Sequence, residues 1–173
     1  MSTVIAIILA GVLSTAEFCA NPIAGGRGEP DWCRLSVSER IDTPYFALVV
    51  GSEVLIGVDQ NGRRISIQFS THQNQAGLFI QAIPLEEVSR IRDSVAGVRQ
   101  YLAGQLSCRP QMLGGIRWER CVPDQWEEKY LSQYYFLQTA TDLLYVDHYA
   151  SALGRQMDAV LARVLDSLVA NGV

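Results

Sequence analysis

Two histidines are the residues of this chain whose type best suits acid–base catalysis. His72 lies in the polar stretch STHQNQ, and His148 lies in YVDHYA. A hydrolytic triad needs a nucleophile, a histidine and an acid that converge in space. Ser70 and Asp147 are neighbours of these histidines in sequence, which does not establish that geometry, and no Gly-x-Ser-x-Gly motif is present. We therefore predict no catalytic residue and keep a periplasmic hydrolase that uses His72 as an alternative.

The sequence offers no ready site for a metal ion or a phosphate group. A helix through His148 would place residues three and four positions away beside it, and none of these is a histidine or a carboxylate. The adjacent glutamates at 86–87 and at 127–128 would point about 100° apart on a helix. The glycines of AGGRG and LGG do not connect a strand to a helix. We predict no metal and no cofactor.

The chain contains four cysteines, Cys19, Cys33, Cys108 and Cys121. An even number of cysteines in a short exported chain indicates a disulfide framework. Four cysteines allow three pairings, and sequence alone does not decide among them. We favour Cys19–Cys33 and Cys108–Cys121, because each pair closes a short loop rich in Gly, Pro and polar residues. A zinc site is disfavoured, because no pair has Cys-x-x-Cys spacing and the histidines are distant in sequence.

The first residues resemble a secretory leader. Residues 4–13 are apolar or small, residues 14–16 are small, and Glu17 is the first charged residue. An apolar core followed by small residues is typical of a signal peptide, although no basic residue precedes it here. The apolar run is shorter than the roughly 20 residues of a membrane-spanning helix. We expect a signal peptide over residues 1–16, with a buried N-terminal strand or helix as the alternative.

Composition limits the partners that this chain can take. It has 173 residues, nearly half of them hydrophobic, which suffices for one domain with a substantial core. The formal net charge is −4, which argues against nucleic acid or anionic lipid as a partner. We expect a single α+β domain over residues 17–173 that holds two disulfides, is periplasmic or secreted, and is not stably inserted in a membrane after leader removal.

Residues 43–83 have the pattern of a four-stranded antiparallel meander. Gly51-Ser52 and Asn61-Gly62 are typical of two-residue hairpin turns between successive strands. Alternation of apolar and polar residues predicts a strand with one buried face. In the third strand the apolar positions are Ile65, Ile67 and Phe69. The buried face of such a sheet needs a cover.

Helical spacing of apolar residues predicts that cover. Apolar residues recur every three or four positions over residues 85–105, which predicts one helix. Residues 107–123 are expected to form a loop or short hairpin. Residues 124–170 are expected to form a C-terminal helical region, with a break near residues 139–142 that divides it into two helices. Sheet and helices together give the α+β architecture.

One segment carries the residue types that are enriched in protein-binding surfaces. The stretch IRWERCVPDQWEEKYLSQYYF combines Trp, Tyr and Arg, which dominate interface hot spots. The partner-binding candidates are Arg117, Trp118, Arg120, Trp126, Tyr130 and Tyr135. The plainer interpretation is an aromatic core rimmed by charge, and the spacing of Trp126, Tyr130 and Tyr134 favours it.

These features favour a small exported binding protein without catalysis of its own. An immunity or inhibitor protein that neutralises a secreted enzyme or toxin fits the size, acidity and cysteines. That step is an association with proteins of this type and not a physical derivation. The alternatives are the hydrolase that uses His72 and a structural envelope component that docks through its C-terminal helices.

Overall fold

The structure is a computed structural model that describes residues 15, 18–27, 30–69, 76–87, 106–123, 130–151 and 157–172. The described residues are mostly β: eleven strands lie in two antiparallel sheets beside the helix α3 (Asp158–Asp166). The predicted α+β fold, a four-stranded meander covered by helices, is therefore wrong. Residues 1–14, 16 and 17 lie outside the described part, so the leader prediction is not tested.

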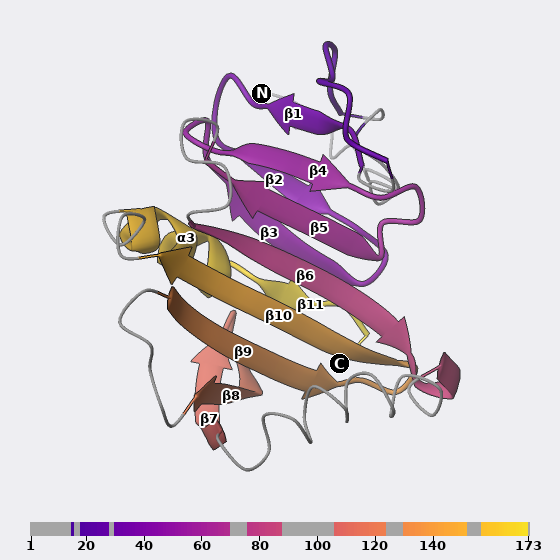
Figure 1. The fold of residues 1–173 in the computed structure, drawn as a ribbon. Helices are drawn as coiled ribbons and strands as arrows, with labels where there is room; N and C mark the ends of the chain where they lie inside the picture. Colours follow the sequence, from indigo (N-terminus) through magenta and orange to yellow (C-terminus); the bar gives the residue numbers. More distant parts are fainter. Residues whose placement is uncertain are drawn as a thin grey trace, which may run out of the picture.

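The larger sheet has eight strands in the order β1-β4-β5-β6-β10-β9-β8-β7 (Figure 1). Their bounds are β1 (Trp32–Arg34), β4 (Leu55–Val58), β5 (Arg64–Gln68), β6 (Ala76–Pro84), β7 (Leu106–Leu113), β8 (Ile116–Pro123), β9 (Tyr130–Gln138) and β10 (Asp142–Ser151). The smaller sheet has the order β11-β3-β2, with β2 (Glu39–Asp42), β3 (Phe46–Val50) and β11 (Val169–Ala170).

The four strands expected within residues 43–83 exist, but they do not form one meander. β4, β5 and β6 pair in succession, and β5 alternates buried and half-buried residues as predicted. β3 instead pairs with β2 and β11 in the other sheet. Four of its five residues are buried, so both of its faces pack against protein. The chain therefore changes sheets at Gly51-Ser52.

The predicted C-terminal helical region is largely sheet. β9 and β10 form a long antiparallel pair within it, and only α3 is helical among its described residues. These strands are rich in aromatic residues, which favour a pleated surface over a helix. Of the helix predicted at 85–105, residues 85–87 are helical and residues 88–105 lie outside the described part.

The segment expected to be a loop or short hairpin is a full hairpin of β7 and β8. Gly114 and Gly115 at its tip have φ of 55° and 82°, which glycine adopts without strain. A Cβ on Gly114 would overlap the carbonyl oxygen of Leu168. The tip of this hairpin therefore packs against the chain that leads into β11.

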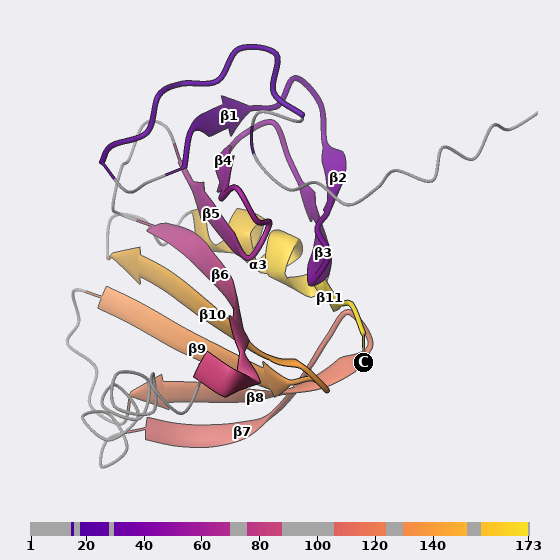
Figure 2. The same ribbon diagram turned by 90° about the vertical axis from the view of Figure 1, so that its right-hand side faces the viewer.

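The core lies between the two sheets. Figure 2 shows α3 between the larger sheet and the smaller one, and α3 contacts β3 and β6. The largest fully buried side chains come from both sheets and α3: Trp118, Phe46, Ile41, Leu48, Ile56, Ile65, Ile67, Leu78, Ile80, Leu144, Leu161 and Leu168. One continuous cluster joins these elements. Among the described residues, no helix is both long and apolar enough to cross a membrane.

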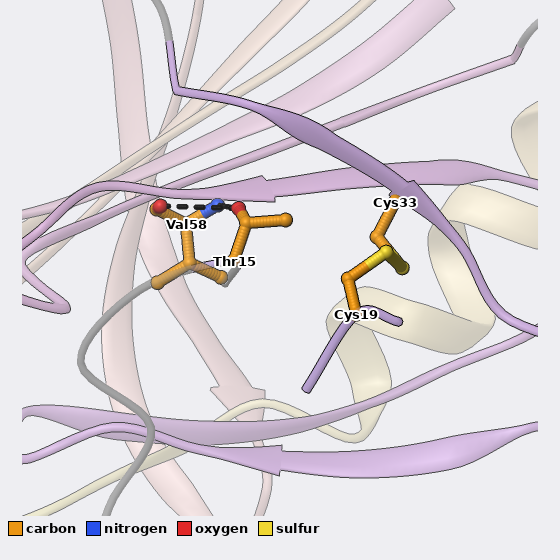
Figure 3. Close-up of a disulfide and its surroundings, with 4 residues drawn as sticks. All are labelled: Thr15, Cys19, Cys33 and Val58. Carbon is orange, nitrogen blue, oxygen red and sulfur yellow. Dashed lines mark hydrogen bonds between the residues drawn. A yellow bond between two sulfur atoms is a disulfide. The ribbon is translucent and has the colours of Figure 1, made fainter. Parts of the chain in front are cut away.

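Both favoured disulfides are present. Cys19–Cys33 ties the N-terminal segment to β1, close to Thr15 and Val58 (Figure 3). Cys108–Cys121 joins directly opposite residues of β7 and β8. The second bond therefore locks the register of the hairpin, in addition to closing its loop.

Candidate functional site

The partner-binding candidates do not all face the same way. Trp118 and Tyr135 are 1% and 5% exposed, so their side chains belong to the interior. Arg120 is half-buried on the same face of the sheet as Tyr135, its partner in register, whereas Arg117 is exposed on the other face of β8. Trp126 and the side chain of Tyr130 lie outside the described part, as does His72.

Arg120 and Tyr135 line a pocket of about 180 Å³ between the sheet and α3, whereas Trp118 does not. Its polar lining comes from β7, β8, β9, β10 and α3 and consists of Gln111, Arg120, Gln133, Tyr135, His148, Asp158 and Asp166. Strand pairing brings these residues together, because Gln133 is directly opposite His148 and Arg120 is directly opposite Tyr135. The described lining includes no Ser, Thr or Cys. These side chains offer hydrogen-bond donors and acceptors, and His148 is the residue whose type suits a base.

Gln133 is the centre of a hydrogen-bond network in this pocket. Its Oε1 accepts from Arg120 Nε at 2.8 Å and from the Tyr135 hydroxyl at 3.0 Å. Burial raises the pKa of Tyr135, while Arg120 opposes that shift. The phenol therefore stays protonated and remains a hydrogen-bond donor at neutral pH. The network fixes the guanidinium of Arg120 at the pocket wall.

His148 forms the deepest polar part of the pocket. It is 3% exposed, and its Nε2 lies 2.7 Å from Asp158 Oδ1. Burial lowers the pKa of His148, the nearby Asp158 opposes that effect, and Arg120 adds to it. Nδ1 has no hydrogen-bond partner among the described residues. The site therefore holds a neutral imidazole with an unused ring nitrogen.

The neighbouring residue Asp147 points to the opposite face of β10. It lies between Phe79 on β6 and Tyr134 on β9, in register with both. Burial raises its pKa to about 6, and its Oδ1 has no hydrogen-bond partner among the described residues. Tyr145 lies two residues away and stacks with Tyr134 at a centroid distance of 6.2 Å. Aromatic rings thus surround a carboxylate that water would otherwise solvate.

A second hollow of about 430 Å³ opens where β8 separates from β9. These strands pair only through Glu119, Arg120 and Cys121, so the strand ends beyond them diverge. The hollow is lined by Phe136, by Leu143 and by residues of β8, some of which are apolar. The exposed side chains beside it on the hairpin include Arg109, Met112, Arg117 and Glu119. This hollow of mixed polar and apolar lining lies directly beside the exposed side chains of the hairpin.

Metal binding has little support from the described residues. Cys108, Glu119 and Cys121 are close enough together to hold an ion. The two cysteine sulfurs are joined to each other, so neither is available as a thiolate ligand. The cluster is therefore explained by the disulfide.

Comparison with known proteins finds no family model and no curated protein that matches the chain. Sequence reasoning selected Arg120 and Tyr135 but missed Gln133, Asp158 and Asp166. It also set His148 aside, because a helix offers that residue no partner three or four positions away. Period-two alternation around His148 was the available signal, since it places His148 on the buried face of a strand.

Proposed function

We propose that this chain is an exported binding protein, without catalysis of its own, that docks to a protein partner through the β7–β8 hairpin. One observation supports it most: a disulfide-locked hairpin presents exposed Arg and Met side chains beside the 430 Å³ hollow. A hairpin held in one conformation loses little entropy when it binds. Arg is enriched in interface hot spots, and an apolar recess accepts an anchoring side chain.

The charge of the hairpin indicates what the partner presents. Residues 106–123 carry three arginines and one glutamate, within a chain whose net charge is −4. A locally positive surface on an acidic protein favours a partner with carboxylates around an apolar side chain. We take this partner to be a secreted enzyme or toxin that the chain neutralises. The two disulfides fit an oxidising compartment, where such a partner would be met.

The partner surface can be tested by charge reversal. We expect Arg109→Glu combined with Arg117→Glu to abolish capture of an exported protein from the periplasmic or secreted fraction. Arg27→Glu is the matched control, because Arg27 is also exposed but lies in the Cys19–Cys33 loop. The captured protein should lose its own activity when it is bound. Equal capture by both variants would show that the hairpin is not the docking surface.

The compartment can be tested separately by thiol alkylation. We expect the protein isolated from cells to react at no cysteine before reduction and at all four afterwards. Intact mass of the same sample reports whether residues 1–16 have been removed. Recovery of an unprocessed chain with free thiols from the cytosol would contradict export.

The structural-component alternative needs a different docking element. It depended on C-terminal helices, and residues 130–151 form β9 and β10 instead. The hydrolase alternative depends on His72, outside the described part, and a variant His72→Ala that keeps any hydrolytic activity would remove it.

A further inference from the structure

The pocket beneath α3 lies on the core-facing side of the sheet, whereas Arg117 and Met112 of the proposed docking surface lie on the other side of the hairpin. Arg109 is on the same face of the hairpin as Arg120, directly opposite it in register. At about 180 Å³ it is smaller than pockets that hold drug-sized ligands. Such a volume suits a molecule of a few heavy atoms.

The pocket carries a positive charge at one end, on Arg120, and a negative charge at the other, on Asp158. Arg120 has no carboxylate within ion-pair distance among the described residues, and only its Nε is used by Gln133. Its remaining N–H groups can donate to an anion. His148 is 97% buried and both of its ring nitrogens are shielded from solvent, so it forms the floor of the pocket beside Asp158, which its Nε2 contacts at 2.7 Å. The carboxylate of Asp158 is 37% exposed and completes an acceptor region beside it.

We propose that this pocket binds a small amino-acid-like zwitterion, a free amino acid or a dipeptide. Its carboxylate pairs with Arg120, and its ammonium group donates to the exposed part of the Asp158 carboxylate. A bare anion would meet Arg120 but also the negative field of Asp158. A bare cation would meet Asp158 but also the positive guanidinium of Arg120. Only a ligand with both charges satisfies both ends.

Calorimetry on the purified full chain with alanine and alanyl-alanine tests the proposal. Propionate and ethylamine serve as the two half-ligands. We expect saturable binding of alanine or alanyl-alanine at millimolar concentration or below, and weaker binding of either half-ligand alone. In a parallel titration followed by NMR, the ligand should shift the imidazole resonances of His148. Absence of both heat and shift would mean that the pocket holds water only, and would overturn the proposal.

Two charge-neutralising variants separate the two ends of the ligand. Arg120→Gln should weaken zwitterion binding about ten-fold or more and should strengthen ethylamine binding, because the repelling guanidinium is removed. Its matched control is Arg117→Gln, which removes an exposed arginine from the other face of the same strand. Asp158→Asn should weaken both the zwitterion and ethylamine by a similar factor.

Asp166→Asn is the control for Asp158→Asn, and its effect should be smaller. Asp166 is eight residues further along α3, about 12 Å away by the rise of a helix.

Zwitterion binding that survives both Arg120→Gln and Asp158→Asn would place the ligand elsewhere and overturn the proposal. Loss of zwitterion binding with Arg117→Glu alone, which lies outside this pocket on the other face of β8, would do the same. Loss of protein capture by Arg117→Glu, with zwitterion binding intact, keeps the two sites distinct.

Discussion

Thr15 and Val58 are joined by two hydrogen bonds that run in opposite directions (Figure 3). The Thr15 hydroxyl accepts from the Val58 amide at 2.7 Å and donates to the Val58 carbonyl at 3.1 Å. Thr15 is 2% exposed, so these hydrogen bonds are shielded from water. Its hydroxyl satisfies the backbone N–H and C=O of Val58, as a neighbouring strand would. A leader that ends at Ala16 would remove this contact from the mature protein.

We expect Thr15→Ala to destabilise the chain of residues 1–173 by about 1–2 kcal/mol, because both groups of Val58 lose a buried partner. Thr15→Ser keeps the hydroxyl and should cost less. Urea unfolding of both variants measures the difference. A chain that begins at Glu17 should match Thr15→Ala in stability. If it is as stable as the full chain, the Thr15 contact contributes nothing to the fold.

Gly114 and Gly115 offer a matched pair for the contact between the hairpin tip and the C-terminal segment. Both have positive φ, so an alanine at either position costs roughly 1–2 kcal/mol of backbone strain. Only at Gly114 would the added Cβ also overlap the Leu168 carbonyl oxygen, whereas the space around Gly115 is open. We expect Gly114→Ala to lower the thermal midpoint clearly more than Gly115→Ala. Equal midpoints would show that the tip does not rest on Leu168.

The sequence predicted best those features that a few neighbouring residues determine. β5 alternates as Ile65 and Ile67 required, and the turn before it contains Gly62 with φ of 62°. Both disulfides close short loops and were favoured for that reason. Each of these depends on residues close together in the chain.

β10 shows why the helical prediction was wrong. Its buried face carries Leu144 and Val146, while Tyr145 and Tyr149 are half-buried on the other face. When both faces of a strand are apolar, a spacing of three or four fits as well as a spacing of two. The pairing of β10 with β6 joins Val146 to Ile80, a contact far apart in sequence with no local signal. The pocket depends on such pairings, so its members could not be grouped from sequence.

Asp147 should make the protein less stable at neutral pH than at acidic pH. Burial raises its folded-state pKa from 3.8 to about 6, so the folded state holds the proton more tightly than the unfolded state. The stabilisation is therefore fully present below pH 3.8 and is lost as the pH rises through about 6. We expect Asp147→Asn to gain roughly 2 kcal/mol over the natural chain at pH 7. At pH 3.5 or so the two should be equal.

Urea unfolding at the two pH values checks this expectation. Asp42→Asn is the control, because Asp42 pairs with Arg40 at the surface and is not in the aromatic face of the large sheet. A lower stability of Asp147→Asn at pH 7 would mean that the carboxylate has a stabilising partner in solution.

His148 should change the pH dependence of folding stability in the opposite direction, so that stability falls at acidic pH. Its folded-state pKa is lowered, chiefly by burial, so its stabilising contribution is present above its ordinary pKa of 6.5 and is lost as the pH falls through the folded-state value. The charged and titratable groups that face it are Arg120 on β8, Tyr135 on β9, and Asp158 and Asp166 on α3. As the pH falls, protonation of Asp147 adds stability and partly offsets the stability that is lost when His148 is protonated. The variant Asp147→Asn lacks that compensation, so its stability should fall more steeply below pH 6.5.

The charges around His148 predict how two substitutions move its pKa. Asp158 favours the protonated imidazole, so Asp158→Asn should lower the pKa of His148 further. Arg120 favours the neutral form, so Arg120→Gln should raise it. NMR titration of the imidazole resonances measures both shifts, and His148→Gln assigns which of the two histidines is observed. Shifts of the same sign in both variants would mean that the ring does not lie between these two charges, and the packing of α3 on β10 would have to differ from that described.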